Sequence, residues 1–143
     1  MSKELETVDS LNELLKGEYM AIESFNNFIP KLDCEEVKGC FQEVQNQHRE
    51  NISNLVEYIQ DIGGQPNENL GVVGKMADFM LDMDLGSDAS DKEIINKAIE
   101  GETKGINMAE KVLRGSLDNE SREVAGDILE RDRQSIEKLK SLK

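Results

Sequence analysis

Apolar residues recur every three or four positions along most of this chain, which is the spacing of one face of an α-helix. The pattern predicts four long helices, over about residues 3–29, 34–62, 90–114 and 117–143. The stretch between the second and third helices, residues 65–90, is a long connection with a short amphipathic segment of its own. The spacing is clearest in the first helix, whose stripe is Val8, Leu11, Leu14, Leu15, Ile22, Phe25 and Ile29.

The predicted helix ends carry residues that start or stop helices. Pro30 should stop the first helix, and Asp33 is the expected N-cap of the second. Gly63-Gly64 is a strong C-terminal signal for the second helix. Ser90, followed three positions later by Glu93, has the form of a capping box at the start of the third helix.

One polar residue interrupts the apolar stripe of each predicted helix. Polar side chains inside a bundle are costly unless they are paired, hydrogen-bonded or bound to a metal. The pattern therefore predicts a polar site where the four helices face one another. Its candidate members are Glu18, His48, Glu102 and Asp132, with Asn51 and Ser135 one turn further along the second and fourth helices.

The second and fourth helices share a local pattern. His48-x-x-Asn51 and Asp132-x-x-Ser135 both place two polar groups at i and i+3, at a constant offset of 84 residues. This indicates two related helix pairs, each with a short loop, joined by the long connection. Such an arrangement is typical of an all-α, ferritin-like four-helix bundle with a long crossover between its second and third helices. The amphipathic segment of that crossover is expected to cover the side of the bundle.

The first helix resembles the bacterioferritin-like family in particular. The run from Leu11 to Glu18, continued by Ala21-Ile22, is similar to the family signature L-N-x-L-L-x-x-E-x-x-A-I, whose Glu is a metal ligand. The end of the second helix, Ile59-x-x-Ile62-Gly63-Gly64, is similar to the family's as well. The resemblance implies a ferritin-like metal protein with iron in the bundle centre.

The ligand positions depart from the family pattern. Glu18 and Glu102 match the family's single Glu positions, while His48-x-x-Asn51 and Asp132-x-x-Ser135 stand where Glu-x-x-His belongs. The resulting set is three carboxylates and one imidazole, with weaker oxygen donors on Asn51 and Ser135. It leaves three outcomes open, namely one iron ion per chain, two, or none. Whether ferroxidase-type activity survives is open for the same reason.

Charge and length limit the number of domains and the kinds of partner that this chain can have. The chain has 143 residues and a formal net charge of -13, which suits one acidic domain over residues 1–143. Nucleic acid and anionic membrane surfaces would repel such a charge, so neither is expected as a partner. The start lacks the apolar stretch of a signal peptide, and a cytoplasmic protein is expected. The family's fifth short helix, used in building large cages, is missing, so we expect a monomer or homodimer.

Three functional hypotheses follow. The first is a metal-binding bundle with a role in iron handling or oxidative-stress defence. The alternative is a non-catalytic structural or interaction bundle, stress- or spore-associated, that retains a relic polar core without metal. A third and weaker hypothesis is redox sensing by Cys34 and Cys40, whose spacing of six places them on poorly matched helix faces. Cys40 is expected in the core and Cys34 near a turn.

Overall fold

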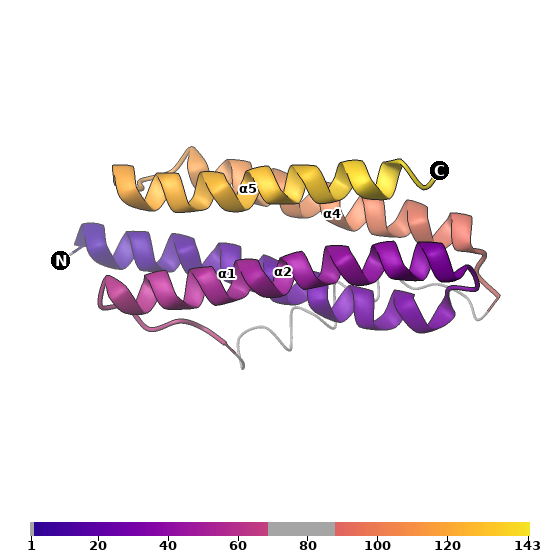
Figure 1. Ribbon diagram of the computed structural model, residues 1–143. Coiled ribbons are helices and arrows are strands. Elements are labelled where there is room, and N and C mark those ends of the chain that lie inside the picture. The colour runs from indigo at the N-terminus through magenta and orange to yellow at the C-terminus, as the bar shows by residue number, and fades with distance from the viewer. Residues whose placement is uncertain (1, 69–87) are drawn as a thin grey trace.

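The computed structural model describes residues 2–68 and 88–143, and it shows these residues as a bundle of long helices without strands (Figure 1). The amphipathic segment of the crossover lies outside the described residues. All four predicted helices are present, with ends within about three residues of the prediction. They are α1 (Ser2–Phe28), α2 (Glu35–Asp61), α4 (Asp91–Leu113) and α5 (Asn119–Lys140), and a 3-10 turn, η1 (Ile29–Lys31), follows α1.

The helices form two hairpins that lie side by side. α1 packs on α2 and α4 packs on α5, and the hairpins meet through contacts of α1 with α4 and of α2 with α5 (Figure 1). Each helix therefore has two neighbours and turns one face to the bundle axis. None of the helices in the described part of the chain has the length and apolarity needed to cross a membrane.

The two residues immediately before α2 are held by a side chain from α4. The prediction that Asp33 caps α2 is wrong, because the N-cap residue is Cys34 and it makes no side-chain capping bond. Instead, the Asp91 carboxylate accepts the backbone N–H groups of Asp33 and Cys34 at 2.8 and 2.9 Å. The capping prediction for Ser90 is confirmed, since its hydroxyl accepts the N–H of Glu93 at 3.2 Å.

The end of α2 is fastened to the first helix. Gly63 has a φ of +84°, which confirms the predicted glycine stop. A Cβ on Gly64 would lie 2.6 Å from the Val8 side chain, so only glycine fits at this approach of the chain to α1. The Asn12 side chain donates to the carbonyl of Gln65 and accepts the N–H of Asn67. Asn12, part of the family-like signature, thus positions the start of the crossover.

Two apolar clusters fill the bundle on either side of a polar layer. One contains Leu11, Leu15, Leu55, Ile59 and Ile128, and the other contains Phe25, Phe28, Phe41, Ile94 and Leu139. Along each long helix the interrupting polar residue falls between a member of the first cluster and a member of the second. The polar site is therefore enclosed by apolar packing at both ends.

Two predicted core positions are not in the core. Ile62 lies three positions after Ile59, so the helical spacing predicts that it is buried, but its side chain is 37% exposed because the chain turns away from the bundle after α2. Cys40 was also placed in the core, yet it is only half-buried. Cys34 is exposed, and both thiols are free.

Candidate metal centre

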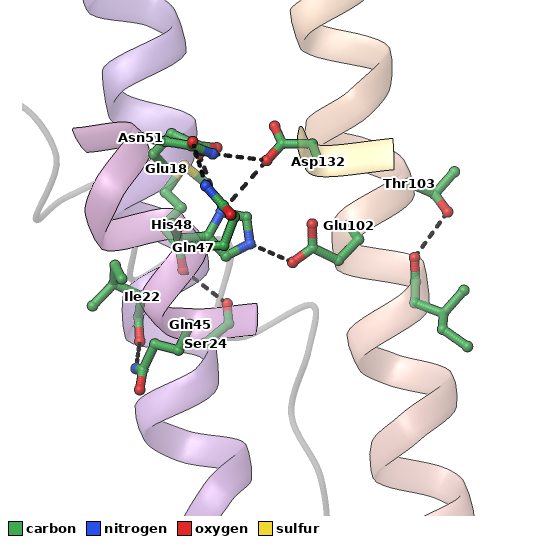
Figure 2. Close-up of polar contacts among 12 residues, drawn as sticks. Glu18, Ile22, Ser24, Gln45, Gln47, His48, Asn51, Glu102, Thr103 and Asp132 are labelled. Atoms are coloured by element: carbon green, nitrogen blue, oxygen red, sulfur yellow. Dashed lines mark hydrogen bonds and ion pairs between the residues drawn. The ribbon is translucent and has the colours of Figure 1, made fainter. Parts of the chain in front are cut away.

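Each of the four long helices contributes one side chain to the centre of the bundle. Glu18 comes from α1, His48 from α2, Glu102 from α4 and Asp132 from α5. All four are buried, with relative exposures from 1% for His48 to 6% for Glu18. Figure 2 shows them converging from opposite sides, with the imidazole in the middle. The structure thus brings together the four residues that interrupt the predicted stripes.

The two nitrogens of His48 face different carboxylates. Nε2 lies 2.5 Å from Glu102 Oε1 on one side. On the other side, Nδ1 lies 3.2 Å from Glu18 Oε1 and 3.7 Å from Asp132 Oδ1. The ring therefore divides the centre into a side that holds Glu102 alone and a side that holds two carboxylates.

The two carboxylates on the Nδ1 side are also joined by an amide. Asn51 Nδ2 donates to Glu18 Oε1 at 2.5 Å and to Asp132 Oδ1 at 3.2 Å (Figure 2). The amide oxygen of Asn51 accepts from Gln47 Nε2 at 3.2 Å, which keeps its NH2 group turned inward. Ser135 is buried one turn beyond Asp132 on α5. The prediction that Asn51 and Ser135 supply weak or water-bridged ligands stays a prediction.

Burial and mutual charge shift the ionisation of this cluster. Burial alone would lower the pKa of His48, but the carboxylates of Glu102 and Glu18 outweigh it and raise that pKa well above 6.5. Burial raises the pKa of Asp132 well above 3.8, and the charge of Glu18 raises it further. Without a cation, the centre therefore retains protons to offset its three carboxyl groups.

The donor set fits a metal ion on the Nδ1 side. Ligand atoms of Glu18, His48 and Asp132 all lie within 4.8 Å of one another, and all three residues are buried. Bonds of about 2.1 Å to a first-row metal place neighbouring ligand atoms about 3.0 to 3.4 Å apart. The distances of 3.2 and 3.7 Å from His48 Nδ1 are close to that spacing. An ion bound there would replace the proton between these groups, and the Asn51 NH2 group, which donates to the same two carboxylate oxygens, would have to turn away.

Two further residues shape the centre. The ring of Phe25 meets the His48 ring edge-on, with centroids 6.0 Å apart, and so covers the imidazole with apolar surface. Gln47, which orients Asn51, was not predicted, because it lies beside the apolar stripe of α2 and not within it. Its i, i+4 spacing to Asn51 is the one sequence signal that could have identified it.

The family assignment rests on a match over most of the chain. A family model described as a domain of unknown function, DUF2383, matches residues 6–115. The chain belongs to the DUF2383 family. The matched region includes α2, α4 and α1 from Glu6 onward, and hence Glu18, His48 and Glu102 of the candidate centre. No curated protein matches the chain.

Solved structures similar to this DUF2383 protein are ferritin-like. The bacterioferritin-related protein of Bacteroides fragilis, described as a dodecameric thioferritin, has a TM-score of 0.75 at 18% identity, covering 94% of this chain and 82% of its own. The Dps protein of Vibrio cholerae O1, described as ferritin-like and diiron-carboxylate, has a TM-score of 0.79 at 14% identity, covering 99% and 91%. A ferritin-like, diiron-carboxylate protein of Bacillus anthracis str. Ames has a TM-score of 0.74 at 22% identity, covering 99% and 98%.

These similarities confirm the predicted fold class. The DUF2383 chain is an all-α, ferritin-like four-helix bundle, and the resemblance found in its first helix is confirmed at the level of the fold. At identities of 22% or less, the similarities support the assignment of the fold but not of the metal chemistry of those proteins.

Proposed function

We propose that this DUF2383 protein binds a transition-metal ion, iron, in the centre of its bundle and serves in iron handling or oxidative-stress defence. The observation that carries the proposal is the convergence of Glu18, His48 and Asp132 around one point, with ligand atoms within 4.8 Å of one another. Carboxylate oxygens with an imidazole nitrogen form a donor set that suits iron. The similarity to proteins described as diiron-carboxylate supports the same choice of metal.

The residues on the two sides of the His48 ring would have different roles in metal binding. Glu18, His48 Nδ1 and Asp132 would hold the ion, with the two carboxylates offsetting its charge. Glu102 would accept the Nε2 proton of His48 at 2.5 Å, which fixes the ring orientation and leaves Nδ1 free to bind. Bound iron would supply Lewis-acid and one-electron redox chemistry, while the apolar clusters above and below would restrict water.

One ion per chain is the stoichiometry that this layout favours. Glu102 lies across the imidazole from the other two carboxylates, so the three carboxylates do not share one face. A second ion would therefore need side chains to rearrange.

Elemental analysis before and after aerobic Fe(II) loading tests the proposal. We expect about one iron per chain in the wild-type protein and loss of that iron in His48→Ala. Gln45→Ala is the matched control, since Gln45 is a buried polar residue of α2 that bonds to the Ile22 carbonyl and to Asn26. No uptake by the wild-type protein, or equal uptake by His48→Ala, would overturn the metal assignment.

A specific observation favours the alternative of a metal-free bundle. Within the described part of the chain, every fully buried side-chain nitrogen or oxygen has a hydrogen-bond partner. A protonated His48 between Glu102 and Glu18 would be a complete network of its own. The protein would then act by association with other proteins, as in a stress- or spore-associated structure. A melting temperature that neither iron nor chelator changes would favour this alternative.

A further inference from the structure

A cavity of about 230 Å³ lies between α1 and α4 and leads to the polar centre. Small residues of the two helices leave the space open, and the exposed Lys104 side chain lines it at the surface. Its inner end is formed by the four polar residues of the centre. The small residues that line it and leave its space unfilled are Gly17, Ala21, Ala98, Gly101 and Gly105.

Gly105 lines the cavity at a position where a side chain would have room to enter it. A Cβ built on Gly105 meets no atom within 4 Å, so the space beside it is open. Gly17, on the facing helix, differs, because a Cβ there would already touch the Met108 thioether at 3.5 Å. Glycine is unfavourable inside a helix, so selection for helix stability alone would not favour a glycine at position 105.

The chemistry of the cavity changes along its length. Phe25, Phe28 and Met108 give most of the wall an apolar character. The inner end presents the carboxyl groups of Glu18 and Glu102, which as anions only accept hydrogen bonds. A molecule that fits would combine an apolar body with one end that donates hydrogen bonds.

We propose that this cavity binds a small apolar amine, with its ammonium group at the carboxylates and its hydrocarbon body between α1 and α4. An apolar protein cavity of about 150 Å³ is large enough for benzene, so 230 Å³ suits a single ring with a short polar arm. The positive charge complements the excess of carboxyl groups over imidazole in the centre. The proposal goes beyond the metal function and does not depend on it, because the ammonium group would contact the metal-free centre.

Three probes of similar shape separate the contribution of the charged group from that of the ring. Benzylamine, benzyl alcohol and phenylacetate share a phenyl ring and differ in the charge of the attached group. Calorimetric titration into the chelator-treated protein should show benzylamine binding about tenfold more tightly than benzyl alcohol, with no binding of phenylacetate. Tighter binding of phenylacetate would assign the polar contact to Lys104 and overturn the proposal, as would equal binding of all three probes.

Substitutions at Gly105 that fill the cavity provide a second test of benzylamine binding. Gly105→Leu should abolish benzylamine binding, and Gly105→Ala should weaken it by a smaller factor. Gly126→Leu is the matched control, because Gly126 is also a helical glycine with open space around it but does not line the cavity. Unchanged binding by a folded Gly105→Leu protein would overturn the proposal.

Iron binding and amine binding can be tested separately. Iron stoichiometry reports on Glu18, His48 and Asp132, whereas benzylamine binding is measured on the metal-free protein. A protein that binds iron but not benzylamine would refute only the amine site. One that binds benzylamine but not iron would refute only the metal centre.

Discussion

At the scale of single residues, His48 decides what the centre can do. Its two nitrogens engage carboxylates from three helices, at distances of 2.5, 3.2 and 3.7 Å. A protonated ring would bind these carboxylates as a buried ion-pair network, whereas a ring that has lost the Nδ1 proton could bind a cation. Metal and proton therefore compete for the same nitrogen.

The first prediction concerns pH and the metal-free protein. The pKa of His48 is raised in the fold, so its stabilising contribution is full below 6.5 and disappears as the pH rises through its folded value. The raised pKa of Asp132 acts in the same direction, with its contribution full only below 3.8. The melting temperature of the chelated protein should thus fall as the pH is increased above 6.5. His48→Ala should show a shallower fall, and an unchanged slope would count against the prediction.

A second prediction separates a ligand from an orienting group. Glu18→Gln removes a charged oxygen from the Nδ1 side, where the ion would bind, and should abolish iron uptake. Glu102→Gln keeps an oxygen acceptor for His48 Nε2 and should reduce iron affinity by only about 10- to 100-fold. Competition with a colorimetric chelator measures both affinities. Equal losses in the two variants would show that Glu102 is itself a ligand.

At the scale of helices, the ends are secured by partners far away in the sequence. The Asp91 carboxylate binds the start of α2 across 57 and 58 positions of sequence. Asn12 of α1 binds the segment after α2 through Gln65 and Asn67. Arg122 of α5 donates to the carbonyls of Leu113, Gly115 and Leu117 in the turn after α4. These bonds connect the helix ends to neighbouring segments of the bundle.

A third prediction tests the cap that Asp91 supplies. Asp91→Ala should lower the free energy of unfolding by about 1 to 2 kcal/mol, since two backbone N–H groups at the start of α2 lose their acceptor. Urea denaturation with an unchanged m-value would measure this loss. Asp88→Ala, at an exposed acidic residue three positions earlier, is the control and should change stability by less than about 0.5 kcal/mol.

At the scale of the whole molecule, the bundle is two helix hairpins enclosing a polar layer between apolar clusters. Among the described residues, Ile62 is the one large hydrophobic side chain that is exposed. The expectation of a monomer or homodimer stays a prediction.

A fourth prediction joins assembly and metal binding. Analytical ultracentrifugation should give the mass of one or two chains. The mass should be the same for the iron-loaded and the chelated protein, because the proposed ligands come from one chain. Iron should raise the melting temperature in proportion to the logarithm of its free concentration. A species of twelve chains would contradict the assembly prediction without affecting the metal assignment.

The sequence by itself determined the four helices and the position of the polar site along them. Apolar periodicity is a local property, so it placed the four helices and identified Glu18, His48, Glu102 and Asp132 as inward-facing. The composition of the centre, three carboxylates and one imidazole, could be read from those positions. Capping at Ser90 was equally local, and the structure confirms it.

Only the tertiary structure decided how those groups meet. Which His48 nitrogen faces which carboxylate depends on the rotation and register of one helix against another, and no local pattern records these. For the same reason, Asp91 took the capping role expected of Asp33, and Gln47 came to orient Asn51. The cavity beside Gly105 likewise exists only because two glycine-bearing helices face each other across it.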